Sequence, residues 1–178
     1  MRVEATARAR ITAIVARFLI IGCGCRGRAL SAELRTHGHA VRGTTRDPGK
    51  AGLIEAAGAT AVVGDPDRIA TLSGALDHVS IACLLLGAAN GAPDQLAALH
   101  GPRLEMLLAR MLDTTVRGIV YEAAGTVEQS LLDNGAELVR AVCEDSRIPY
   151  ALLRADPADH RAWLRASWSW IEGLLGSG

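Results

Sequence analysis

Short apolar runs alternate with longer segments of mixed polarity along most of this chain. Most of the runs are apolar throughout rather than at every second position, which is typical of strands buried on both faces of a parallel sheet. The pattern predicts six strands, at residues 18–21, 40–45, 59–63, 79–86, 118–124 and 150–154.

The segments that follow these runs have the composition and spacing of helices. They predict helices at residues 28–35, 49–57, 68–75, 128–145 and 159–175, and one that ends at 112 and begins near Pro93 or Leu104. Six strands that each precede a helix predict an α/β fold: a doubly wound parallel six-stranded Rossmann sheet in the order 3-2-1-4-5-6, with helices on both faces. Its ligand site is expected at the carboxyl ends of the first and fourth strands.

The chain of 178 residues has room for one such core, but not for a nucleotide domain together with a sizeable substrate domain. We therefore expect a single domain at 17–178. Residues 1–16 are rich in arginine and alanine, and we interpret them as an N-terminal helix or a leader.

A Gly-x-Gly-x-x-Gly pattern stands between the first predicted strand and the first helix, the context in which it indicates dinucleotide binding. Gly22 is expected to make the tight turn, Gly24 to let the backbone approach a pyrophosphate, and Gly27 to let the helix pack closely on the strand. The N–H groups at the start of the helix then face the phosphates. The predicted loop residues are Gly22, Cys23, Gly24, Cys25, Arg26 and Gly27.

The end of the second strand indicates which dinucleotide is bound. An NAD site normally has a carboxylate there, but this strand ends in Thr44 and Thr45, and Arg46 follows. A guanidinium suits a 2′-phosphate, so we expect NADP rather than NAD. In the alternative interpretation, Arg46 is an ordinary solvated surface residue. Asp47, which precedes Pro48, is expected to cap the next helix.

Charge and cysteine usage exclude several other classes of protein. The net charge is +0, so no overall field attracts nucleic acid or an anionic membrane, and no apolar run is as long as a membrane span. The four cysteines lack metal-ligand spacing, and we expect reduced thiols in a cytoplasmic protein without a metal site. Lys50 is the only lysine.

Several segments resemble the atypical and extended branch of the short-chain dehydrogenase/reductase superfamily, which includes the NmrA-like regulators and the NAD(P)-binding epimerase/dehydratase relatives. The resemblance covers roughly residues 17–156. The matching pieces are the glycine loop and residues 45–48, 64–65, 86–89 and 148–154.

The resemblance implies that Arg46 reaches the adenosine 2′-phosphate and that Asp65 binds the adenine amino group. It also implies that residues 86–88 (Leu86, Gly87 and Ala88) line the adenine and the nicotinamide ribose. Pro66 departs from the family pattern, because it removes a backbone donor beside Asp65. On sequence alone, Asp65 is equally well explained as a turn or helix-cap aspartate.

The catalytic Tyr-x-x-x-Lys pair of the superfamily is missing. Glycine stands four residues after Tyr121, and Arg154 stands four residues after Tyr150. Thr126 and Tyr121 are the remaining catalytic candidates, with core or capping roles as the alternative.

These features predict an NADP(H)-binding Rossmann protein that acts as a redox or cofactor sensor or regulator. Two alternatives stay open: an NADP-dependent oxidoreductase or epimerase-like enzyme on a small carbonyl or sugar-type substrate, and a Rossmann assembly module that binds no nucleotide. Besides the dinucleotide, the expected partners are a small-molecule substrate, a protein partner or a second copy of the chain. The three tryptophans of the last predicted helix are expected to pack on the sheet or to form a dimer seam; in the alternative, its start with Trp163 overhangs the substrate crevice.

Overall fold

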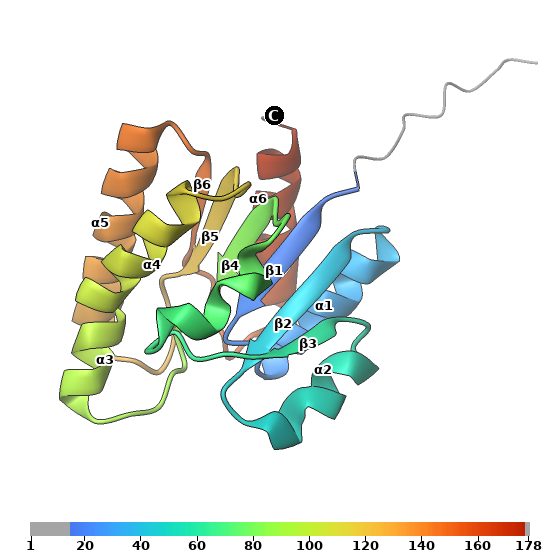
Figure 1. The fold of residues 1–178 in the computed structure, drawn as a ribbon, viewed down its shortest axis with the longest axis horizontal. Coiled ribbons are helices and arrows are strands. Elements are labelled where there is room, and N and C mark those ends of the chain that lie inside the picture. The colour runs from blue at the N-terminus through green and yellow to red at the C-terminus, as the bar shows by residue number, and fades with distance from the viewer. Residues whose placement is uncertain (1–14, 177–178) are drawn as a thin grey trace, which may run out of the picture.

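The computed structural model, which describes residues 15–176, has a six-stranded sheet at its centre (Figure 1). All neighbouring strands are parallel, and their order is β3-β2-β1-β4-β5-β6, which confirms the predicted fold class. The strands are β1 Arg17–Ile21, β2 Ala40–Thr45, β3 Thr60–Val63, β4 Ile81–Leu84, β5 Gly118–Glu122 and β6 Tyr150–Leu153.

Helices cover both faces of the sheet and separate two apolar cores. One face is covered by α1 Cys25–Thr36, α2 Ala51–Ala56 and α6 His160–Leu175, and the other by α3 Pro93–Leu99, α4 Pro102–Leu112 and α5 Gln129–Ser146. Strand β1 shows why both covers are needed. Leu19 and Ile21 belong to the core under α4 and α5, whereas Phe18 and Ile20 belong to the core under α1 and α6. Successive side chains of a strand point to opposite faces, so an apolar run requires a cover on each side.

The prediction of an α-helix at residues 68–75 is wrong. The segment forms two short 3₁₀ helices, Ile69–Leu72 and Gly74–Leu76. The Thr71 hydroxyl donates to the Arg68 carbonyl at 2.7 Å and accepts the Asp65 N–H at 2.8 Å. Such side-chain bonds to the backbone compete with an α-helix, and Gly74 disfavours one further.

The helix predicted to end at 112 is α4, which begins close to the later of the two expected starts, and residues 93–99 form a separate helix, α3, which His100 and Gly101 divide from it. Pro102 is the first residue of α4, where its missing N–H costs nothing, but inside a continuous helix it would break the hydrogen-bond ladder. Two strands are also shorter than predicted: β4 ends at Leu84 rather than 86, and β5 at Glu122 rather than 124. The residue directly after each strand keeps one bond to the neighbouring strand, since the Leu85 N–H donates to the Ile21 carbonyl and the Ala123 N–H to the Leu153 carbonyl, both at 2.9 Å.

The segment predicted as a helix at 49–57 begins instead with a 3₁₀ turn, Pro48–Lys50, which leads into α2. The expected helix or leader at 1–16 falls almost entirely on residues 1–14, outside the described residues. Within residues 15–176, no helix has the length and apolarity that crossing a membrane requires.

Packing between α5 and β5 gives a first testable prediction. A Cβ on Gly135 would overlap the hydroxyl of the buried Tyr121 and would lie 3.3 Å from Leu104. We expect Gly135→Ala to lower the free energy of unfolding by about 1–3 kcal/mol through overpacking, as measured by urea denaturation.

Gly52→Ala in α2 is the matched control, because its Cβ meets nothing within 4 Å. This second variant is expected to leave stability unchanged or to raise it by up to about 1 kcal/mol through helix propensity. Equal effects of the two substitutions would contradict the packing at Gly135.

Candidate functional site

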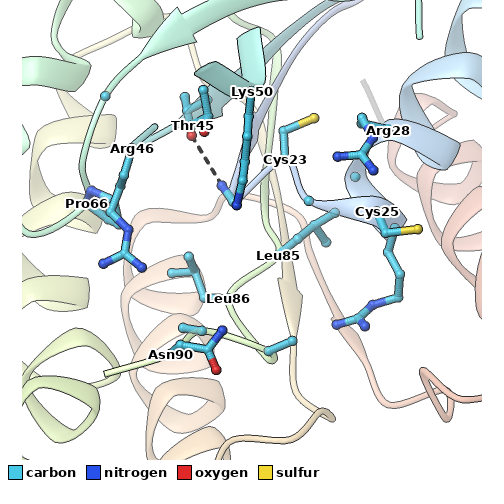
Figure 2. A pocket seen from close by; sticks show the side chains of 18 of the residues that line it. Cys23, Cys25, Arg28, Thr45, Arg46, Lys50, Pro66, Leu85, Leu86 and Asn90 are labelled. Atoms are coloured by element: carbon cyan, nitrogen blue, oxygen red, sulfur yellow. Dashed lines mark hydrogen bonds between the residues drawn. The ribbon is translucent and has the colours of Figure 1, made fainter. Parts of the chain in front are cut away.

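A cleft of about 560 Å³ opens at the carboxyl ends of β1, β2 and β4 (Figure 2). Its walls are the loop 22–28, residues 44–46 with Lys50 and Leu53, residues 64, 66 and 67, and residues 85, 86, 88–90 and 99. All the predicted cofactor residues lie in these walls except Asp65 and Gly87. The position is that of the switch point in a doubly wound sheet.

The glycine loop is held against the end of β2 by two backbone N–H groups. The Gly22 N–H donates to the Thr44 hydroxyl at 3.2 Å, and the Cys23 N–H donates to the Thr44 carbonyl at 3.0 Å. Gly22 has a φ of +82°, and a Cβ there would overlap the Leu85 carbonyl. Only glycine fits this turn without strain.

The N-terminus of α1 faces the cleft and has room for an anion in front of it. Gly24 is the N-cap, no side chain caps the helix, and its first turn contains no acidic residue. A Cβ on Gly24 would meet nothing within 4 Å, whereas one on Gly27 would lie 3.2 Å from Ile20. Gly24 thus leaves space for a phosphate, and Gly27 lets the helix pack on β1. This arrangement fits a pyrophosphate bound by backbone N–H groups.

Most charged side chains in the walls of the cleft are basic. Arg28, Arg46 and Lys50 line it together with Arg26 (Figure 2). Asp67 is the acidic residue among the lining residues, and its carboxylate is 2.7 Å from Arg103 in an ion pair. The cleft therefore carries an excess of positive charge although the chain as a whole is neutral.

Sequence reasoning missed Lys50 and Arg28 as cleft residues. The signal for Lys50 was its position four residues after Arg46 in a short turn. Asp47 directs this turn, because its carboxylate accepts the Gly49 N–H at 2.9 Å, and its predicted capping role is confirmed.

The structure places Asp65 and Gly87 outside the lining of the cleft. The Asp65 carboxylate accepts the N–H of Asp67 at 3.0 Å within its own turn, which is the geometry of the turn-aspartate interpretation rather than of an adenine ligand. Pro66 and Asp67 line the cleft instead. The Gly87 N–H faces away from the cleft and donates to Glu122 at 2.8 Å.

The two catalytic candidates do not meet at the cleft. The Tyr121 side chain is fully buried against α5, and its hydroxyl is 2.7 Å from His100 Nδ1. Burial raises the pKa of Tyr121, which opposes loss of its proton. Thr126 is exposed in the loop after β5 and is not among the cleft residues. This placement corrects the expectation for Tyr121, because a substrate in the cleft cannot reach a hydroxyl inside the core.

The spacing of four between Tyr150 and Arg154 does not make a catalytic pair, for a different reason. Tyr150 is the first residue of β6 and Arg154 directly follows its last residue, and four residues of strand span about 13 Å. The Tyr150 hydroxyl donates to Glu144, and Arg154 pairs with Asp133 at 2.9 Å. A spacing of four brings side chains together on a helix, but not on a strand.

The tryptophans of α6 have three different environments. Trp163 is fully buried, and Trp168 stacks on His37 with ring centroids 3.8 Å apart. Trp170 is 50% exposed. The first two therefore pack the helix onto the domain, as the core interpretation expected. The Cys25 thiol is exposed at the start of α1, and all four cysteines are free.

A buried carboxylate beside the cleft was also missed by sequence reasoning. Glu122 is fully buried at the end of β5, and its Oε1 is 2.7 Å from Arg26 Nη2. Burial raises the pKa of Glu122 above its ordinary value of 4.5, while the Arg26 guanidinium and the Gly87 N–H act in the opposite direction. A glutamate in an otherwise apolar strand was the signal in the sequence.

The raised pKa of Glu122 predicts a pH dependence of stability. The folded protein holds the carboxyl proton more tightly than the unfolded chain, so this group stabilises the fold at low pH. That contribution is lost as the pH rises from 4.5 through the raised value.

Glu122→Gln has no such proton to lose. Its free energy of unfolding is expected to increase relative to that of the wild type as the pH rises, in urea denaturation between about pH 4 and pH 8. A constant difference between the two proteins over this range would contradict the raised pKa.

Comparisons with known proteins agree with this geometry. Residues 18–100 match the TrkA-N domain family. No curated protein matches the sequence. Among solved structures, a short-chain dehydrogenase/reductase superfamily protein from Agrobacterium tumefaciens with bound NAD has 25% identity and a TM-score of 0.65, over 78% of this chain and 48% of that one.

Two further solved structures share the fold. UDP-glucuronic acid 4-epimerase from Bacillus cereus, in complex with NAD, has 16% identity and a TM-score of 0.59, over 76% of this chain and 55% of that one. Triphenylmethane reductase from Citrobacter sp., complexed with NADP(H), has 19% identity and a TM-score of 0.59, over 78% and 48%. The chain thus spans about half the length of these proteins. Residues 18–100 are thus similar to a TrkA-N domain, and the chain shares the Rossmann-like fold of these solved structures, in agreement with the resemblance found in the sequence.

Proposed function

We propose that this protein binds NADP(H) and acts as a cofactor sensor or regulator rather than as a dehydrogenase. The observation that carries the proposal is the composition of the cleft. Its walls contain four basic side chains, and every lining residue lies between Gly22 and Leu99. The cleft is therefore built to hold an anionic nucleotide, and the strands that would add catalytic groups do not contribute to it.

Arg46 and Lys50 are the residues proposed to hold the 2′-phosphate. Both are exposed, both line the cleft at the end of β2, and the turn between them is capped by Asp47 (Figure 2). A guanidinium supplies a planar pair of donors and an ammonium supplies a point charge, which together suit a dianionic phosphate. An NAD site would need a carboxylate near this position for the ribose hydroxyls.

The remaining walls fit the other parts of a dinucleotide. The open space at Gly24 and the N-terminus of α1 suit the pyrophosphate, and Leu53 and Leu86 offer apolar surface to the adenine. When bound, the nicotinamide supplies hydride transfer, which is the cofactor's own chemistry. What the protein supplies is binding and orientation.

A sensor is favoured over an enzyme because no acid or base of the described residues replaces the Tyr-Lys pair in the cleft. Tyr121 is in the core, and Lys50 is on the adenosine side. The match covers only about half of the epimerase and reductase neighbours, so their activities remain the second candidate function. A homodimer, a protein partner and a cytoplasmic location remain predictions.

Titration of the purified protein with NADPH and NADH, followed by heat or tryptophan fluorescence, tests the proposal. We expect saturable binding of NADPH that is tighter than binding of NADH and that weakens with added salt, since exposed charges are screened. Arg46→Ala should weaken NADPH binding by about tenfold to a hundredfold, as expected for the loss of a charged hydrogen bond of about 1.5–3 kcal/mol, and should leave NADH binding nearly unchanged.

Arg110→Ala is the matched control, because it removes the same charge from an exposed site on α4, outside the cleft. Equal binding of the two dinucleotides, or an equal effect of the two substitutions, would contradict the assignment of Arg46. Turnover of NADPH with a panel of small carbonyl compounds would favour the enzyme over the sensor.

A further inference from the structure

Arg26 belongs to the phosphate loop but points away from it. It is the second residue of α1, yet its guanidinium reaches the end of β5, 96 positions further along the chain. Its Nε and Nη2 both contact Oε1 of Glu122, at 2.8 and 2.7 Å. The guanidinium carbon also lies 5.6 Å from the centre of the Trp163 ring. The side chain is thus held on two sides, by a carboxylate and by an aromatic ring.

The same carboxylate fixes a second loop. Oε2 of Glu122 accepts the Gly87 N–H at 2.8 Å, and the Gly87 carbonyl accepts the Val127 N–H at 3.0 Å. The backbones of Gly87 and Gly125 approach so closely that a Cβ on either residue would overlap the other loop. Glu122 therefore ties together the segments that follow β1, β4 and β5.

The contact leaves part of Arg26 available to a ligand. Its side chain is 20% exposed and lines the cleft, and Nη1 takes no part in the contacts with Glu122. A guanidinium that is already fixed loses little entropy when it binds an anion. Gly87 directly follows the cleft residues Leu85 and Leu86. Arg26 thus lines the cleft itself, whereas Gly87 acts through its neighbours, because it lies between the lining residues Leu86 and Ala88.

We propose that Glu122 is a positioning residue, which holds Arg26 and Gly87 in place for the pyrophosphate and nicotinamide half of the dinucleotide. This inference rests on the proposed NADP(H) binding and adds a role for a residue that does not touch the ligand. Without the carboxylate, Arg26 is free to turn toward solvent and Gly87 loses its acceptor. A purely structural ion pair would instead affect every ligand of the cleft to the same degree.

Two ligands separate these possibilities. NADPH occupies both halves of the site, whereas 2′,5′-ADP occupies only the adenosine half. We expect Glu122→Gln, which keeps the size of the side chain, to weaken NADPH binding by about tenfold, the usual order for a lost charged hydrogen bond, and 2′,5′-ADP binding by less than about twofold. Arg46→Ala is the contrasting variant and should weaken both ligands.

Arg26→Lys provides a second variant, because it keeps the charge but not the planar fork. It should show the same selective loss of NADPH affinity, and it carries the test if Glu122→Gln does not fold. Equal losses for both ligands, or no loss for either, would overturn the positioning role alone. Failure of the wild type to bind either ligand would overturn the proposed function, and this inference with it.

Discussion

The attachment of the glycine loop to β2 is the interaction on which the rest of the site depends. Two N–H groups of the loop bond to Thr44, and the left-handed turn at Gly22 lets the chain reverse there without meeting the Leu85 carbonyl. The turn fixes where α1 begins and therefore where its free N–H groups point. Because β4 lies beside β1 in the sheet, residues 85, 86 and 88–90, which follow β4, line the same cleft as the glycine loop.

The fold and the phosphate loop could be predicted from the sequence because their causes are local. Continuous apolar runs require a cover on both faces, and the glycine spacing has one sterically permitted use between a strand and a helix. The errors occurred where short-range polar bonds or a proline override propensity. Thr71 bonds to the backbone where an α-helix was predicted, and the segment forms 3₁₀ helices instead. Pro102 begins a helix of its own, so residues 93–112 do not form one continuous helix. Asp65 bonds to its own turn for a similar reason.

The side-chain partners could not be predicted because they join distant parts of the chain. Arg26 and Glu122 are 96 positions apart, and Tyr121 of β5 meets His100, the C-cap of α3, which is 21 positions away. Hydrophobic periodicity predicts which face of a strand is buried, but it does not predict which polar group of another segment a buried side chain contacts. The neighbouring residues Tyr121 and Glu122 illustrate this point. Tyr121 packs in the core under α4 and α5, whereas Glu122 pairs with Arg26 of the phosphate loop.

The positions of the charged side chains say more about function than the net charge of the chain does. A net charge of +0 gives the molecule no general attraction for anions, so an anionic ligand must be recognised by local geometry. Basic groups collect around one cleft. Of the carboxylates at or beside it, Asp67 pairs with Arg103, and Glu122 is buried and pairs with Arg26. The buried pair neutralises Arg26, whereas no ion pair of the described residues neutralises Arg28, Arg46 or Lys50. The proposed selectivity for a ligand with an extra phosphate on its adenosine side rests on the charges of Arg46 and Lys50.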